Sequence, residues 1–289
     1  MIHINLIQRN NNLSVLPFYE DDNEQLHNRS YAYGDIYPLY TPMGTVPPFQ
    51  IIKEHYVGAS VTSAVLKKSD GETVGSILSG LNSAGMLYIP FADYDIIAYP
   101  SSSPAGLTSA EGQYYIELVT SDGKLYYSDV FTVVGQTGGF IAIQWWDIED
   151  LQMDGGRIVY KNGGVEFRNT LWLQTQLGKP EYTFNEEGET RDGYFFPEKM
   201  VSEKTYKCTI LASEYLCDIM RFIRLSDYVF VQDQYGNTYR CDTFLITPKW
   251  ETQGNIASVE IEFTCFTVAK KIGRGSTGLA DENINLNND

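Results

Sequence analysis

The sequence predicts a mainly β protein, in which an immunoglobulin- or fibronectin-like β-sandwich precedes a second β domain, a sandwich or split barrel with one packed α-helix. Two observations carry this prediction. Short runs of alternating apolar and polar residues recur between polar turns, a pattern typical of strands. The chain also contains 21 Tyr and 14 Phe, and aromatic side chains favour pleated, half-buried surfaces.

Chain length and net charge limit the number of domains and the kinds of partner that we expect. With 289 residues, of which 43% are hydrophobic, the chain has room for two globular domains. Its formal net charge is −16, and its Lys and Arg residues are scattered. Such a surface repels polyanions and anionic lipid, so we expect neither specific nucleic-acid binding nor a membrane partner. The first residues lack the basic start and the apolar run of a signal peptide, so we expect synthesis in a cytoplasm.

Composition divides the chain into segments. Residues 1–46 are polar and irregular, and we expect an extended N-terminal arm that packs along its own domains or reaches a neighbouring subunit. Residues 47–135 form the predicted immunoglobulin-like sandwich, and the glycine-rich linker 135–139 follows. The second domain spans 140–272. Residues 273–289 are small, polar and acidic, and are predicted to be a disordered tail.

The clearest hairpin lies in the first domain. Its strands are residues 112–120 and 124–134, and Ser121-Asp122-Gly123 forms the turn, because Asp-Gly supplies the positive φ that a tight hairpin needs. The Cys and Trp signature of antibody domains is absent, so the prediction of a sandwich depends on strand spacing alone. The other expected strands of this domain are 49–52, 64–67, 86–89 and 95–99.

The second domain is expected to end in a helix and a meander. Ser213 is a suitable N-cap for a helix over 213–225, and Tyr215, Ile219 and Phe222 fall on one face of it. In the last strand Val259, Ile261 and Phe263 alternate with polar residues, so we expect one face to be buried and the other to be exposed to solvent. Residues 185–192 are polar and predict a long loop. The expected strands are 140–146, 157–161, 169–177, 203–211, 228–233, 238–250 and 256–269.

No motif indicates catalysis, a cofactor or a metal. The phosphate-binding loops and the G-x-S-x-G elbow are absent. The four cysteines, Cys208, Cys217, Cys241 and Cys265, have no C-x-x-C spacing and lie far from the three histidines. They are interpreted as buried free thiols of a reducing compartment.

Two acidic clusters leave a catalytic alternative open. They are Asp147, Glu149 and Asp150, and Glu186, Glu187 and Glu189. A glycosidase needs two carboxylates across a cleft, which sequence clusters do not establish. The spacing of the first cluster does not follow a calcium-binding EF-hand loop. Solvated loop charge is the favoured interpretation.

The four tryptophans, Trp145, Trp146, Trp172 and Trp250, are candidate interface residues. Trp145 and Trp146 are adjacent on a strand, so they point to opposite faces, and one of them is expected in the core. Exposed tryptophans would also stack on sugars, so a glycan-binding surface module is the alternative.

The segment 204–272 resembles the tail-tube and distal-tail proteins of long-tailed bacteriophages. The likeness lies in a strand, the helix at 213–225, a hairpin with a YGN turn, and the segment PKWETQGNIASVEIEF. The runs PFQII, YYSDVFTVV and GYFFPEKMVSEKTYKCTILASEYLCDIMRFIRLSDYV are similar to phage and prophage proteins of gut Bacteroidetes.

This resemblance implies a function that needs no active site. It implies a structural virion protein whose copies join side by side into a ring, with other tail proteins as further partners. It also implies assembly in the bacterial host cytoplasm and a place in the tail. A first domain ahead of the ring-forming fold favours a distal-tail, baseplate or adaptor role over the bulk tube.

Overall fold

The chain forms a mainly β structure, as the sequence predicts. The computed structural model describes residues 15–20, 39–54, 60–89, 92–99, 107–147, 151–152, 158–160, 167–250, 256–265 and 269–272. Within these residues most strands join one 15-stranded sheet, beside a three-stranded and a two-stranded sheet. The predicted tail at 273–289 lies outside the described residues.

The first half of the chain contributes strands to two sheets. The large sheet takes β1 (Phe18–Glu20), β2 (Leu39–Pro42), β4 (Val61–Lys68), β5 (Thr73–Ser76), β8 (Gly112–Thr120), β9 (Leu125–Ser128) and β10 (Phe131–Val134). The three-stranded sheet consists of β3 (Phe49–Glu54), β7 (Ala92–Tyr99) and β6 (Asn82–Ile89), and a short 3-10 helix spans Leu78–Gly80. One hydrophobic core receives side chains from both sheets, for example Phe49 of β3 and Leu118 of β8. This arrangement is consistent with a β-sandwich.

The predicted hairpin is present, with one irregularity. Both β9 and β10 pair with β8, but Tyr127 lies opposite Glu117 whereas Phe131 lies opposite Tyr114, so the register shifts by one residue. The expected single strand 124–134 is therefore interrupted. Ser128 accommodates the break, because its hydroxyl accepts a hydrogen bond from the backbone N–H of Ile116.

Strand β2 connects the two halves of the chain. It pairs in parallel with β10 of the first half, and its Tyr40 lies opposite Trp172 of β14 (Asn169–Leu173). β1 likewise pairs with β9. Where residues 1–46 are described, the segment therefore packs along the chain's own sheet.

The second half is a continuous run of strands around one core. The strands are β11 (Ile141–Trp146), β12 (Leu151–Gln152), β13 (Ile158–Tyr160), β14, β15 (Glu181–Arg191), β16 (Tyr194–Ser213), β17 (Tyr228–Gln232), β18 (Thr238–Trp250), β19 (Ile256–Cys265) and β20 (Ala269–Ile272). In the large sheet they follow the order β14-β11-β17-β18-β19-β16-β15, while β12 and β13 pair with each other. The core takes Ile143 from β11, Val231 from β17 and Ile261 from β19.

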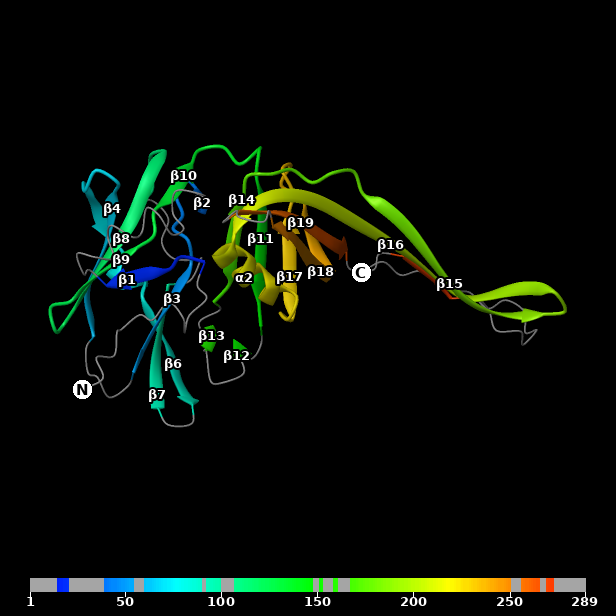
Figure 1. Cartoon of the computed structure of the whole chain (residues 1–289), viewed down its shortest axis with the longest axis horizontal. Coiled ribbons are helices and arrows are strands. Elements are labelled where there is room, and N and C mark those ends of the chain that lie inside the picture. The colour runs from blue at the N-terminus through cyan, green and yellow to red at the C-terminus, as the bar shows by residue number, and fades with distance from the viewer. Residues whose placement is uncertain are drawn as a thin grey trace, which may run out of the picture.

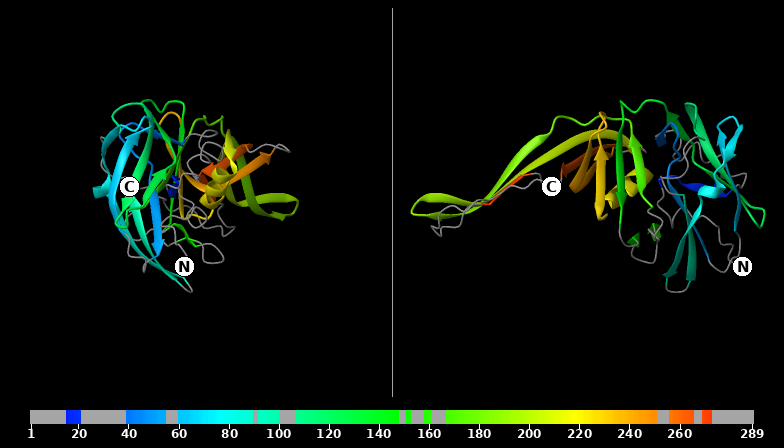
Figure 2. Two further views of the ribbon diagram at one scale, coloured as in Figure 1. Left: turned by 60° about the vertical axis from the view of Figure 1, so that its left-hand side comes forward. Right: turned by 180° about the vertical axis from the view of Figure 1, so that it is seen from behind.

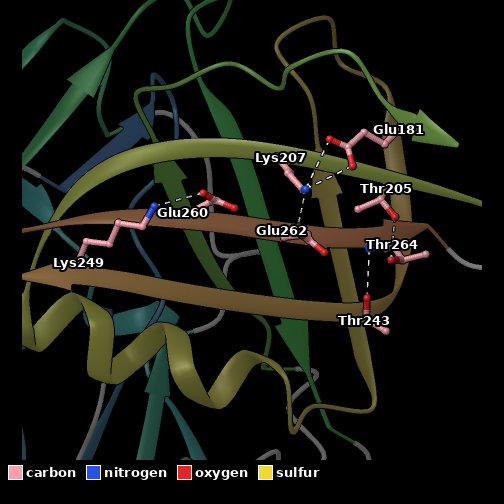
Figure 3. Close-up of polar contacts among 8 residues, drawn as sticks. All are labelled: Glu181, Thr205, Lys207, Thr243, Lys249, Glu260, Glu262 and Thr264. Atoms are coloured by element: carbon pink, nitrogen blue, oxygen red, sulfur yellow. Dashed lines mark hydrogen bonds and ion pairs between the residues drawn. The ribbon is translucent and has the colours of Figure 1, made fainter. Parts of the chain in front are cut away.

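The expected alternation in β19 is confirmed. Val259, Ile261 and Phe263 are buried, whereas the residues between them lie on the opposite, polar face. Figure 3 shows that this polar face is held by cross-strand contacts. Lys207 of β16 forms ion pairs with Glu181 and Glu262, and the other contacts join Lys249 to Glu260, Thr205 to Thr264, and Thr243 to Thr264.

The predicted helix is α2 (Glu214–Ile223), and it covers the apolar face of β16, β18 and β19. Its buried stripe is Leu216, Ile219, Met220 and Ile223, at the i, i+3, i+4 and i+7 spacing of one helical face. Cys217 is buried beside it. Tyr215 and Phe222, expected on one face together with Ile219, are half-buried at the margin of this stripe.

Ser213 is the N-cap of α2, as predicted. Its hydroxyl accepts a hydrogen bond from the backbone N–H of Leu216, which no residue of the helix can satisfy.

We expect Ser213→Ala to lower the free energy of unfolding by about 1 kcal/mol. Urea denaturation measures the change. The matched control is Ser258→Ala on the exposed face of β19, which should stay within about 0.5 kcal/mol of the parent. Equal stability of the two variants would contradict the capping role.

The predicted polar loop at 185–192 is wrong, because these residues belong to a long hairpin. Residues of β15 pair with β16 from Glu181 opposite Thr205 to Arg191 opposite Tyr194. The expected strand 203–211 is only the inner half of β16, and the expected strand 169–177 ends at Leu173. β15 was missed because both of its faces are exposed, and the alternation of Tyr182 and Phe184 with polar residues does not continue into residues 185–191.

This hairpin gives the molecule its elongated shape. Figure 1 shows β15 and β16 extending far from the body that contains the other strands, and Figure 2 shows the same projection from two further sides. β20 pairs with β16 at Lys199–Ser202, within the projecting part. We call β15, residues 194–204 of β16 and the connecting turn the arm. This hairpin is distinct from the predicted N-terminal arm at residues 1–46.

Candidate interaction surface

The arm exposes apolar side chains that no described part of the chain covers. Every residue of β15 is exposed, including Tyr182 (62%) and Phe184 (68%). Across the tip, Tyr194 (72%) and Phe195 (49%) are exposed on β16. Large aromatic side chains are normally buried, so a group of them on a projecting hairpin indicates a contact surface.

The tip of the arm has the geometry of a tight turn. Asp192 and Gly193 have φ of 52° and 82°, the two positive values that a type I′ hairpin turn requires. Arg191 forms an ion pair with Glu189 just before the turn. The Asp-Gly pair was the sequence signal that could have revealed this hairpin, as it did at Asp122-Gly123.

The arm also presents an open strand edge. Among the described strands β15 pairs with β16 alone, so its outer backbone N–H and C=O groups have no partner strand there. An open edge of this kind is a template for another strand. β15 carries Glu181, Glu186, Glu187 and Glu189, and these charges oppose uncontrolled pairing between like edges.

Three of the four candidate tryptophans are not free at the surface. Trp145 is only 2% exposed and belongs to the core of the second half, so it is unavailable to a partner. Trp146 follows Trp145 on β11, so its side chain points to the opposite face of the sheet, as expected. It is half-buried there. Trp172 is also half-buried, on β14. Trp250, at the end of β18, is 46% exposed.

Trp146 is engaged within the chain. Its ring stacks on Tyr228 and Phe230 of the neighbouring strand, at centroid distances of 5.3 and 5.2 Å. The Arg168 guanidinium lies 4.5 Å from the centroid of the Trp146 ring, a cation–π contact. These contacts stabilise the outer face of β11 and β17 and occupy the ring surface that a sugar would need.

Comparison with models of known protein families, and with curated proteins, finds no significant match for this chain. Among the described residues, no helix is long and apolar enough to cross a membrane. Over the same part of the chain, no group of three or more His, Cys, Asp and Glu side chains is placed to hold a metal ion.

Of the two acidic clusters, the structure describes Asp147 and the three glutamates at 186–189. Glu186, Glu187 and Glu189 lie on the exposed arm. Asp147 lies at the end of β11, while Glu149 and Asp150 fall outside the described residues. Asp147 directly follows β11, which lies in the body, whereas β15 projects away from it (Figure 1).

The side chain of Asp147 is held by hydrogen bonds within the chain. It is buried, and it accepts hydrogen bonds from the backbone N–H of Asp227 (2.7 Å) and the hydroxyl of Ser226 (3.4 Å), in the turn that follows α2. Burial raises the pKa of the Asp147 carboxyl to about 6, against the opposing effect of the Asp227 hydrogen bond. The residue thus anchors the connection from α2 to β17.

A second buried carboxylate holds the turn between β17 and β18. Asp233 accepts hydrogen bonds from the backbone N–H groups of Tyr235 and Asn237, from the Asn237 side chain, and from the Tyr239 hydroxyl. Burial disfavours its ionised form, but these hydrogen bonds outweigh burial and lower its pKa. The predicted YGN turn at 235–237 is therefore held by a hydrogen-bond network within the chain.

Proposed function

We propose that this protein is a non-enzymatic structural protein of a tailed-phage virion. Its copies would assemble side by side into a ring of the tail or baseplate, in a distal-tail or adaptor role. The observation that carries the proposal is the arm, which projects from a sheet-and-helix body with an open edge and exposed aromatic rings. The resemblance of segment 204–272 to tail-tube and distal-tail proteins supports it.

The arm has the chemistry of a subunit contact. Tyr182, Phe184, Tyr194 and Phe195 each offer a large rigid surface at low conformational cost. Burying apolar area yields about 25 cal/mol per Å², so covering such rings on a partner contributes substantially to association. The body has little need of the arm for its own core, because the described β16 side chains in the core of the second half begin at Tyr206.

A second copy of the chain is the favoured partner. Four glutamates make the sequence of the β15 edge acidic, whereas β20, beside β16 on the opposite edge, has the basic sequence AKKI. Edges of opposite charge favour a head-to-tail contact, in which the β15 edge of one copy meets the β20 edge of the next. Two edges of the same charge repel each other, which disfavours pairing of β15 with β15. A head-to-tail contact that closes on itself forms a ring.

The first half and the N-terminal residues suit an adaptor role. Most of their buried residues build a separate core, Val15 belongs to the core of the second half, and β2 pairs with strands of both halves. A connection of this kind would hold the ring against another tail protein of the virion, after assembly in the host cytoplasm. Neither a cofactor nor a nucleic-acid site enters this proposal.

A channel lining is available on the polar face of β16, β18 and β19. The ion pairs on this face join three glutamates (Glu181, Glu260 and Glu262) to two lysines (Lys207 and Lys249). We propose that this face is turned to the channel, where it would not attract DNA. A basic lining in the assembled ring would contradict this assignment.

A glycan-binding role receives less support. It would need exposed aromatic platforms, yet only Trp250 among the four tryptophans is exposed. Trp146 already stacks on Tyr228 and Phe230.

Removing the rings of the arm tests the assembly. We expect the parent chain to form a discrete oligomer at high concentration in analytical ultracentrifugation. The double variant Tyr182→Ser/Phe184→Ser should raise the dissociation constant at least tenfold, because it removes two exposed rings without touching the core. The matched control is Tyr235→Ser, which removes an 81% exposed tyrosine at the β17–β18 turn and should leave assembly unchanged. A parent chain that stays monomeric, or an arm variant that assembles as well as the parent, would refute the proposal.

A further inference from the structure

Two of the four cysteines face each other across neighbouring strands. Cys241 of β18 lies directly opposite Cys265 of β19 in an antiparallel pair. Residues opposed in this way have Cα atoms about 4.5–5.5 Å apart and side chains on the same face. A disulfide requires Cα atoms about 4.4–6.8 Å apart, so the backbone already meets its main geometric condition.

A β-bulge creates this juxtaposition. The register of β18 and β19 shifts between Cys241 and Thr243, where Thr243 lies opposite Thr264. Without the extra residue, Asp242 would lie opposite Cys265. The irregularity therefore replaces a carboxylate with a thiol at the position facing Cys265.

Both thiols reach the same side of the sheet. Cys265 is buried in the core of the second half, and Cys241 packs against that core while remaining partly accessible. The two groups interact electrostatically, since Cys265 adds to the effect of burial in raising the pKa of the Cys241 thiol. Burial also raises the pKa of Cys265, although the nearby Lys204 ammonium opposes it.

The other two cysteines have no such partner. Cys208 of β16 lies opposite Ile261, and Cys217 lies on α2. They serve as internal controls for any chemistry of the facing pair.

We propose that Cys241 and Cys265 are an oxidation site, at which a small-molecule disulfide converts the two thiols to a cross-strand disulfide. The thiolate of one of the two cysteines attacks one sulfur of the reagent, forming a mixed disulfide and releasing one small thiol. The deprotonated second cysteine then attacks the sulfur of the first and releases the second small thiol. The protein loses two electrons and two protons, and the reagent is reduced to two thiols.

The site lies at the base of the arm. Thr264, next to Cys265, is opposite Thr205 of β16, the first residue of β16 after the arm. A disulfide there would tie β18 to β19 beside the point where the arm leaves the body. This chemistry does not depend on ring assembly, and it would let a chain made in a reducing cytoplasm gain a cross-link after release.

Thiol mapping of the full chain tests the proposal. The purified protein is incubated at mildly alkaline pH with excess oxidised glutathione, digested without reduction, and analysed by mass spectrometry. We expect two of the four thiols to be lost, a peptide that links Cys241 to Cys265, and recovery of both thiols on adding a dithiol reductant. Cys208→Ser and Cys217→Ser should retain the link, and Cys265→Ser should stop at glutathione bound to Cys241.

The same experiment can overturn the proposal. Four persistent thiols, a stable mixed disulfide at Cys241 in the parent chain, or links that involve Cys208, Cys217 or a second molecule would each do so. Each of these outcomes is measured on the parent chain, so the conclusion does not depend on whether any variant folds.

Discussion

Replacing Phe263 with alanine is expected to destabilise the protein by about 3–5 kcal/mol. Phe263 is 0% exposed in the core beneath α2, and its ring stacks on Tyr206 with centroids 5.5 Å apart. Alanine would remove the ring and leave a cavity between β16, β18 and β19, because a close-packed core relaxes only in part. The free energy of unfolding, measured by chemical denaturation, gives the change.

Phe184→Ala is the matched control on the arm. Phe184 is 68% exposed, so the same substitution removes no core contact and should change stability by less than about 0.5 kcal/mol. The two variants separate the role of the body from that of the arm. A loss below about 1 kcal/mol for Phe263→Ala would show that the second core is not packed as described.

Asp147→Asn is expected to remove a pH-dependent destabilisation. Burial raises the pKa of Asp147 from 3.8 to about 6, so between these values the folded chain binds more protons than the unfolded chain. Stability from this group is therefore complete below pH 3.8 and is lost as the pH rises through about 6. A shift of this size corresponds to about 3 kcal/mol, and solvent screening lowers our expectation to about 2 kcal/mol.

Unfolding free energies of the parent and of Asp147→Asn, measured from pH 4 to pH 7, test this linkage. The variant should gain about 2 kcal/mol relative to the parent as the pH rises, since its neutral amide can still accept the Asp227 N–H bond. The comparison cancels the titration of the other carboxylates. A constant difference across this range would contradict a raised pKa at Asp147.

The local elements were largely predictable from the sequence. The strand at 238–250 and the N-cap Ser213 were predicted correctly, because turn chemistry and apolar periodicity mark them. The tryptophan pair was predicted to split between core and surface. The sequence could not say that Trp145 is the buried member, since that choice depends on which face of β11 meets α2 and β19.

The long-range features were not predictable in the same way. The pairing of β2 with both β10 and β14 joins residues distant in sequence, and no local pattern marks it. The arm was missed for another reason. Its polar residues read as a loop because a strand exposed on both faces lacks the alternation that burial imposes. The surface on which the proposed function depends is thus the part that periodicity is least able to reveal.

Electron microscopy of the purified full chain tests the central claim most directly. We expect closed rings with cyclic symmetry, in which the arm of each subunit lies against the next subunit and the edge of β15 is covered. Single-subunit particles at all concentrations, or rings in which β15 points freely into solvent, would contradict it.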